Sequence, residues 1–179
     1  VRALIVNTET GENVGQGVAC YPRWKAGLYQ HPEYSIFRQH PLDYLESLEK
    51  CITTALAELT EEQKDHVIGI GVDTTGSTPV PVDKNGIPLA LLDEFAENEN
   101  AMFFLWKDHA AAAEADEINK LFRNNSENDY TKYQGDYSAE WYWAKILYAV
   151  RHDEAIRQAA YTWEEHCDWM TGILCGETR

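Results

Sequence analysis

Residues 67–80 read VIGIGVDTTGSTPV, and this stretch decides the fold that the sequence predicts. Residues 67–73 are predicted to form a central strand covered on both sides, because 67–72 are all apolar or glycine. Gly69 and Gly71 would let a neighbouring element pack closely. A small polar turn over 74–78 follows the strand, and α/β proteins bind ligands at the carboxyl ends of such strands. The stretch therefore indicates an α/β protein with a polar pocket at this turn.

The segments on either side alternate between strands and helices. Residues 1–7 and 13–20 predict a hairpin, because both are apolar and β-branched around a turn at Gly11. An aromatic-rich loop is expected over 21–39. Pro41 can begin a helix at no cost, and a leucine stripe from Leu42 to Leu59 predicts packing on a sheet.

Further strands and helices are expected in the second half. The Asn-Gly pair at Asn85-Gly86 predicts a hairpin of strands 80–82 and 87–92. Another buried strand is expected over 102–105, and Asp108 is in position to cap the helix after it. The remaining predictions are helices over 109–122, 138–150, through Ala160, and through Leu174 to a stop at Gly176.

Composition restricts the classes of protein to which the chain can belong. It has 179 residues, 44% of them hydrophobic, which suits a single folded domain and excludes disorder. Its 30 acidic and 15 basic side chains give a formal net charge of −15, which disfavours nucleic acid and anionic membranes as partners.

No metal site or export signal is predicted. The four cysteines form no C-x-x-C pair, and the six histidines show no metal-ligand spacing. The sequence contains no apolar run of the roughly 20 residues that span a bilayer and no signal segment. A cytoplasmic location is therefore expected.

Two polar clusters are candidates for ligand binding. The first is the turn after the strand, 73–78, whose hydroxyls and amides can hydrogen-bond a polyhydroxy ligand. The second contains Trp106 and Asp108, since an indole face suits the C–H face of a sugar and a carboxylate suits its hydroxyls. Each has a plainer interpretation, the first as a tight turn and the second as a buried tryptophan before a helix cap. Composition and spacing leave both interpretations open.

In order, the segments resemble the N-terminal domain of the FGGY carbohydrate kinases, most of all the bacterial members that act on L-ribulose. The strongest matches are GIGVDTTGSTP at 69–79 and LWKDH at 105–109. The other segments that carry the resemblance are 1–4, 21–24, 94–98, 100–102, 137–141, 143–147 and 167–169.

The resemblance implies a ribonuclease H-like (actin-like ATPase) domain with its first strand missing, so that 1–179 is a partial N-terminal domain. It also implies transfer of the γ-phosphoryl group of ATP to L-ribulose, with Mg²⁺, in L-arabinose catabolism. The family's first phosphate loop is expected before Val1. The catalytic base, second phosphate loop and adenosine site are expected beyond Arg179. No catalytic residue, bound cofactor or metal is therefore expected in this chain, which we expect to be inactive alone.

Site residues follow from the same resemblance. Thr75, Gly76 and Ser77 match the turn that touches the sugar, and Trp106 and Asp108 match a Trp-x-Asp element that lines the sugar cleft. From the phosphate side only Arg2 is expected. Glycerol kinases have an Arg-Glu pair at the position of Gly76 and Ser77, and xylulokinases have Met-His nearby, so neither substrate is favoured. The family's usual arginine two residues after the aspartate is Ala110 here, and Asn7 replaces a common aspartate.

Two alternatives remain open at the level of sequence. One is a sugar kinase of the same family that acts on a different ketose or pentitol. The other is a carbohydrate-binding module with no catalytic half. If the first strand is missing, the edge beside 1–7 is unpaired, and self-association of the chain is expected.

Overall fold

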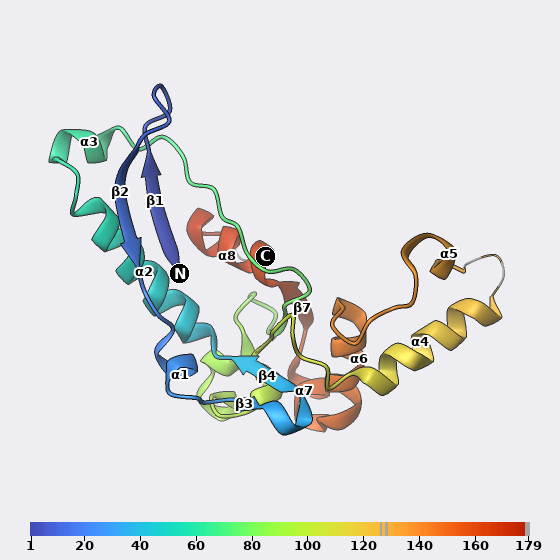
Figure 1. The fold of residues 1–179 in the computed structure, drawn as a ribbon. Helices are drawn as coiled ribbons and strands as arrows, with labels where there is room; N and C mark the ends of the chain where they lie inside the picture. Colours follow the sequence, from blue (N-terminus) through green and yellow to red (C-terminus); the bar gives the residue numbers. More distant parts are fainter. Residues whose placement is uncertain (126, 128, 178–179) are drawn as a thin grey trace. The chain divides into compact units, whose positions relative to one another are not determined.

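The structure is a computed structural model that describes residues 1–125, 127 and 129–177 (Figure 1). Strands and helices are mixed along the whole chain, and four short 3₁₀ helices (η) join them. The elements are β1 (Arg2–Val6), β2 (Asn13–Val18), α1 (Pro22–Lys25), β3 (Gln30–His31), η1 (Pro32–Tyr34), β4 (Ile36–Gln39), α2 (Pro41–Leu56), α3 (Glu61–Asp65), β5 (Pro79–Val82), η2 (Leu89–Leu91), η3 (Asp93–Phe95), η4 (Glu99–Ala101), β6 (Phe103–Phe104), α4 (Ala112–Asn124), α5 (Thr131–Gln134), α6 (Tyr142–His152), α7 (Glu154–Ala159), β7 (Thr162–Glu165) and α8 (His166–Cys175).

The chain packs as two compact units. Unit 1 contains Val1–Leu28 and His40–Gly71, and unit 2 contains Tyr29–Gln39 and Val72–Arg179. This division describes local packing, and the assignment of 1–179 to one partial domain stays a prediction.

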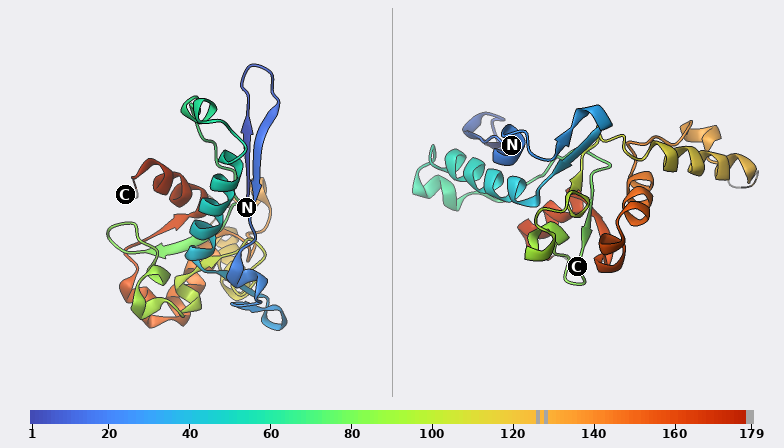
Figure 2. Two further views of the ribbon diagram at one scale, coloured as in Figure 1. Left: turned by 90° about the vertical axis from the view of Figure 1, so that its left-hand side faces the viewer. Right: turned by 90° about the horizontal axis from the view of Figure 1, so that it is seen from below.

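Unit 1 is a hairpin with a helix packed on it. Strands β1 and β2 pair antiparallel, with Leu4 opposite Gln16, so the predicted hairpin is confirmed. Helix α2 lies along one face of this hairpin, as the views in Figures 1 and 2 agree. The contact is close because β2 has glycine at the positions that face the helix. A Cβ atom on Gly17 would lie only 2.0 Å from the Cys51 carbonyl oxygen.

Helix α2 begins at Pro41 as predicted, but its most buried face differs from the leucine stripe. His40 caps the helix by accepting a 3.1 Å hydrogen bond from the Leu42 backbone N–H. The fully buried positions include Tyr44, Cys51 and Ala55, whereas Leu42 is only half-buried. The small side chains of Cys51 and Ala55 let the helix backbone approach the glycines of β2, which leucines would prevent.

The predicted central strand over 67–73 is wrong. These residues form no regular element and run as a plain trace in Figure 1. Ile68 is 86% exposed and Ile70 is 67% exposed, so their apolar side chains are not covered. An extended segment becomes a strand only when neighbouring strands take its backbone hydrogen bonds, and the described residues supply none here.

Unit 2 contains two small antiparallel sheets around an aromatic core. Strand β4 pairs with β3 and β6, and β5 pairs with β7. The expected loop over 21–39 is therefore wrong where α1, β3 and β4 form, and β7 was not anticipated. Strand β4 pairs with the nearby β3 and also with β6, which is distant in sequence, and the partner of β7 is the distant β5. The strand expected at 102–105 is confirmed as β6, where Phe103 packs on Trp169 at 5.2 Å between ring centroids.

The second predicted hairpin forms only its turn. The Asp83 carboxylate accepts hydrogen bonds from the backbone N–H groups of Asn85 and Ile87, at 2.8 and 3.0 Å. Beyond the turn a single bridge joins Val82 to Pro88, and the chain then enters η2. Strand β5 takes its main partner from β7 instead.

Helices α4 and α6 of unit 2 start later than predicted and end two residues after the predicted ends. Helix α4 begins at Ala112 and α6 at Tyr142, three and four residues after the predicted starts. Helix α8 ends at Gly176, whose φ of 70° is the left-handed conformation that glycine adopts without strain.

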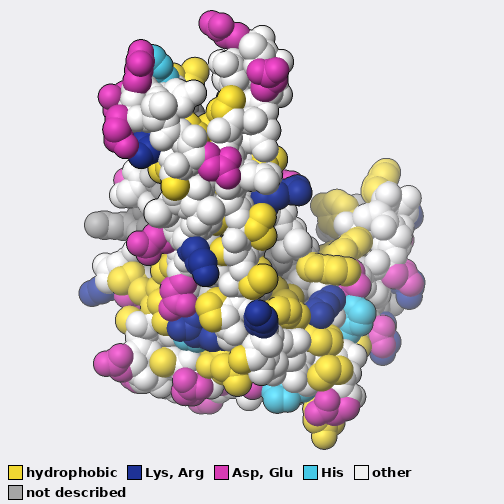
Figure 3. Space-filling view, turned by 60° about the vertical axis from the view of Figure 1, so that its left-hand side comes forward, with side chains coloured by type: hydrophobic (Ala, Val, Ile, Leu, Met, Phe, Trp, Pro, Cys, Tyr) yellow, Lys and Arg dark blue, Asp and Glu magenta, His cyan; other side chains and the backbone are white. Residues whose placement is uncertain are grey.

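On the face drawn in Figure 3 the negative charge is dispersed. Acidic side chains are spread over the face in Figure 3 rather than gathered in one patch. Among the described residues no helix is long and apolar enough to cross a membrane.

The close contact between α2 and β2 predicts a strong effect of one methyl group. We expect Gly17→Ala to lower the free energy of unfolding by about 1–3 kcal/mol, because its Cβ would overlap the Cys51 carbonyl oxygen. Urea unfolding followed by circular dichroism measures this change. Gly69→Ala is the matched control, since its Cβ would have no atom within 4 Å. Equal unfolding curves for the two variants would contradict the prediction.

Candidate functional site

The polar turn after residue 72 lies in unit 2 and presents part of itself to solvent. Thr75 and Gly76 are exposed, Ser77 is half-buried and Thr78 is buried. The Thr78 backbone N–H donates a 2.5 Å hydrogen bond to the Glu165 carboxylate, and the hydroxyls of Thr75 and Thr78 lie 3.2 Å apart. Ser77 has a φ of +54°, a left-handed conformation that side chains other than glycine rarely adopt. The turn is thus a fixed structure with exposed polar groups at its tip.

The second cluster follows β6 and divides into exposed and buried residues. Trp106 is 50% exposed, which leaves part of its indole face available to a ligand. Lys107 is half-buried and its Nζ lies 4.1 Å from the centroid of the Phe37 ring. The segment is joined to β4 by a 3.1 Å hydrogen bond from the Leu105 N–H to the Phe37 carbonyl.

Asp108 is fully buried, and its carboxylate is used inside the protein. It forms an ion pair with Arg38, which is itself only 1% exposed. The same carboxylate accepts hydrogen bonds from the backbone N–H groups of Phe37, at 2.6 Å, and Ala110, at 3.1 Å. Asp108 was expected to cap the next helix, but α4 starts four residues later, so that prediction is wrong. The carboxylate instead fixes the turn before the helix to β4.

Lys145 joins the two polar clusters from inside the protein. Its side chain is 0% exposed, and its Nζ donates to the carbonyl oxygens of Ser77, at 2.5 Å, and Leu105, at 2.9 Å. Burial, together with the positive charge of Arg38, lowers the pKa of Lys145 to about 7. The turn at 73–78 and the Trp106 segment are therefore held to one nitrogen atom.

Arg2 is the one candidate that lies in unit 1. It is exposed on β1. Among residues 1–125, 127 and 129–177, no group of three or more His, Cys, Asp or Glu side chains could hold a metal ion.

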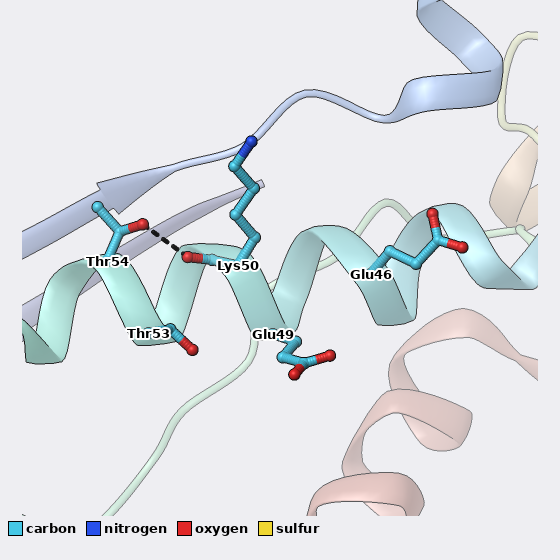
Figure 4. Close-up of a pocket in the computed structure, with 5 residues that line it drawn as sticks. All are labelled: Glu46, Glu49, Lys50, Thr53 and Thr54. Atoms are coloured by element: carbon cyan, nitrogen blue, oxygen red, sulfur yellow. Dashed lines mark hydrogen bonds between the residues drawn. The ribbon is translucent and has the colours of Figure 1, made fainter.

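A shallow depression on α2 contains none of the predicted site residues. It is lined by Glu46, Glu49, Lys50, Thr53 and Thr54, all on one helix (Figure 4). The Thr54 hydroxyl donates within the helix to the Lys50 carbonyl, at 2.7 Å. Its residues do not converge on a common point, so we assign it no binding function.

Sequence reasoning missed Lys145 and Arg38. A signal for Lys145 exists, because it stands alone among apolar residues in the run from Trp143 to Leu147. A lysine at a core-facing helical position is almost never fully buried unless it is paired. Arg38 gives no comparable signal, since it lies in a stretch that the sequence predicts as a loop.

Comparison with known proteins gives a consistent group of relatives. No family model matches the chain. A ribulokinase of Vibrio parahaemolyticus is 52% identical over 175 residues, which cover 97% of this chain and 31% of that protein. A ribulokinase of Bacillus licheniformis is 34% identical over 184 residues, covering 98% of this chain and 32% of the relative.

Among solved structures, a xylulose kinase from Brucella ovis has a similar fold. Its TM-score is 0.67 at 15% identity, over 96% of this chain and 31% of the other. At this identity the likeness shows the fold alone, which is α/β as the sequence predicts. The chain spans about a third of the length of these relatives, and the match lies at their N-terminal end.

The buried pair of Arg38 and Asp108 predicts a large loss of stability when one partner is removed. Asp108→Ala should lower the free energy of unfolding by about 3–5 kcal/mol, because it leaves a guanidinium buried without its counter-ion. Chemical denaturation measures the change.

Asp136→Ala is the control, since Asp136 pairs with Arg123 at the surface and both side chains are more than half exposed. Its expected cost is below about 1 kcal/mol. A similar loss of unfolding free energy in both variants would show that the buried pair with Arg38 stabilises the protein no more than a surface pair does.

Proposed function

Because this chain corresponds over nearly its whole length to the N-terminal third of the ribulokinases, we propose that it is part of an ATP-dependent carbohydrate kinase. The full-length protein phosphorylates L-ribulose to L-ribulose 5-phosphate, a step in L-arabinose catabolism. The observation that carries this proposal is 52% identity to a ribulokinase over 97% of the chain.

In the proposed reaction, this chain and the rest of the full-length protein have different roles. The O5 hydroxyl of L-ribulose attacks the γ-phosphorus of ATP, the bond to the bridging oxygen breaks, and ADP leaves. A base takes the hydroxyl proton, and Mg²⁺, when bound, would supply neutralisation of charge on the phosphates. In this proposal the metal and the base belong to parts of the full-length protein that this chain does not cover, as the family resemblance implies.

The two polar clusters of unit 2 form one wall of the sugar site in this proposal. Thr75, Gly76 and Ser77 offer hydroxyl and backbone groups to the sugar hydroxyls, and the first two are exposed. Trp106 offers a half-exposed indole face to the C–H face of the sugar. Their common attachment to Lys145 supports treating them as one surface.

Asp108 and Arg2 have roles in this proposal that differ from those of the other site residues. A direct sugar contact by Asp108 stays a prediction, and its burial supports a role in positioning Trp106. A phosphate contact by Arg2 also stays a prediction, which its exposed position on β1 permits. We include a cytoplasmic location in the proposal, and the absence of disulfides among the four cysteines is consistent with it.

An assay of the full-length protein that carries this sequence tests the proposal. ADP formation is coupled to NADH oxidation with L-ribulose, xylulose and glycerol as substrates. We expect kcat/KM for L-ribulose to exceed the other values by at least about tenfold, because hydroxyl recognition discriminates strongly between polyols. Equal or better turnover of glycerol would contradict the proposal, and no turnover of any sugar would favour a binding module.

The Trp106 contact is tested in the same assay. Trp106→Ala should raise KM for L-ribulose by about tenfold and change KM for ATP little, because the indole contacts only the sugar. Trp143→Ala is the control, since Trp143 is 64% exposed but lies outside both clusters. An unchanged KM for the sugar in Trp106→Ala would remove Trp106 from the site.

We further propose that the 179-residue chain associates with itself. In the described residues β1 pairs only with β2, and Leu4 and Val6 are each 50% exposed on it. An unpaired edge beside exposed apolar side chains favours strand addition.

Sedimentation velocity over a range of concentrations should therefore detect dimers or larger species. Leu4→Lys should reduce association, whereas Leu121→Lys on α4 should not. A strict monomer at every concentration would contradict this prediction.

A further inference from the structure

Lys145 is the one fully buried lysine among the described residues, and nothing in the proposed chemistry requires it. It lies on α6 between Ala144 and Ala149, which are also fully buried. An ammonium group enters a protein interior only when strong acceptors compensate for lost water. Its acceptors are therefore the clue to its function.

Both acceptors are backbone carbonyls of the two polar clusters. Nζ lies 2.5 Å from the Ser77 oxygen and 2.9 Å from the Leu105 oxygen. The Leu105 oxygen also accepts a 2.9 Å hydrogen bond from the Asp108 N–H. The lysine thus connects the turn at 73–78 with the segment whose conformation Asp108 and Arg38 fix.

The backbone conformation of Ser77 indicates that the hydrogen bond from Lys145 acts as a restraint on this turn. Its φ of +54° is unfavourable for a residue with a side chain, and such residues persist only when their surroundings hold them. A hydrogen bond from Nζ to the carbonyl of this same residue is such a restraint. Without it, the backbone of Ser77 would be free to return to a more common conformation.

A purely stabilising role does not account for the choice of residue. A well-packed apolar side chain at a buried site is usually as stabilising as a buried charge or more so. Arg38 adds a second buried positive charge, and Glu165 and Glu140 are the acidic groups whose charges act on the amine. The fold thus retains an amine at a position where an apolar residue would suffice for packing.

We propose that Lys145 is a positioning residue that sets the relative placement of the Thr75–Ser77 turn and Trp106 for sugar binding. This inference rests on the proposed function of those two clusters as the sugar wall. Lys145 acts through the two carbonyls and does not touch the substrate.

The first test needs no substrate. Hydrogen exchange is measured by mass spectrometry on Lys145→Met, which keeps the length of the side chain but removes its donors. Exchange should rise by about tenfold or more in peptides covering 73–78 and 104–109, because both lose the same restraint. Peptides covering β2 in unit 1 are the internal reference, and Lys120→Met, an exposed lysine on α4, is the matched control. Unchanged exchange in either of the two site peptides overturns the proposal.

The second test uses the full-length enzyme and separates positioning from general damage. Lys145→Met should raise KM for L-ribulose by about tenfold or more while KM for ATP changes less than about twofold, because a small displacement of a binding wall weakens the oriented complex. Lys145→Gln should have a KM for L-ribulose between those of the unmodified enzyme and Lys145→Met, because glutamine keeps N–H donors. Equal changes in both KM values, or none, contradict the proposal.

The two tests distinguish failure of this inference from failure of the proposed function. If the unmodified enzyme does not phosphorylate L-ribulose, the proposed function is wrong, and hydrogen exchange still decides whether Lys145 holds the two segments. If Lys145→Met and Lys145→Gln both fail to fold while Lys120→Met folds, Lys145 belongs to the general stability of unit 2, and the proposal is overturned.

Discussion

A charged group inside a protein must have hydrogen-bond partners, because an unpaired charge there costs several kcal/mol. Unit 2 buries two such groups next to each other, the ammonium of Lys145 and the guanidinium of Arg38. The first finds its partners in backbone carbonyls, and the second finds the carboxylate of Asp108. Each of these partners belongs to a segment of the candidate site. The requirement that stabilises the charges therefore also fixes the site.

The parts of the fold that depend on neighbouring residues could be predicted from the sequence. The β1–β2 hairpin follows from turn residues between two apolar runs, and α2 begins where Pro41 follows a capping residue. Gly176 ends α8 because it can adopt a left-handed φ. In each case the signal and the structure lie within a few residues of one another, so a local pattern is sufficient.

The parts that depend on distant partners could not be predicted. Residues 67–73 have the composition of a central strand, yet composition cannot supply the neighbouring backbones that a strand needs. The opposite error occurred at β4 and β7. Their residues look irregular, but they pair with strands that lie far away in sequence, as at Arg38↔Phe104 and Val82↔Thr162. Sequence alone identified the polar turn and Trp106, but it could not identify the buried groups that hold them.

The distinction between exposed and buried residues also changes how a motif is interpreted. The run LWKDH at 105–109 resembles one element of the sugar cleft, but its members serve different purposes. Trp106 is half-exposed and can meet a ligand from solvent, whereas Asp108 is fully buried and already bonded. A motif combines residues that contact a substrate with residues that place them, and the sequence does not separate the two. Burial does, because only an exposed group can exchange its bonds with water for bonds with a sugar. Under the proposed function, the contacts with the sugar come from Thr75, Gly76 and Trp106, and the buried charges of Lys145 and Arg38 hold these residues in place.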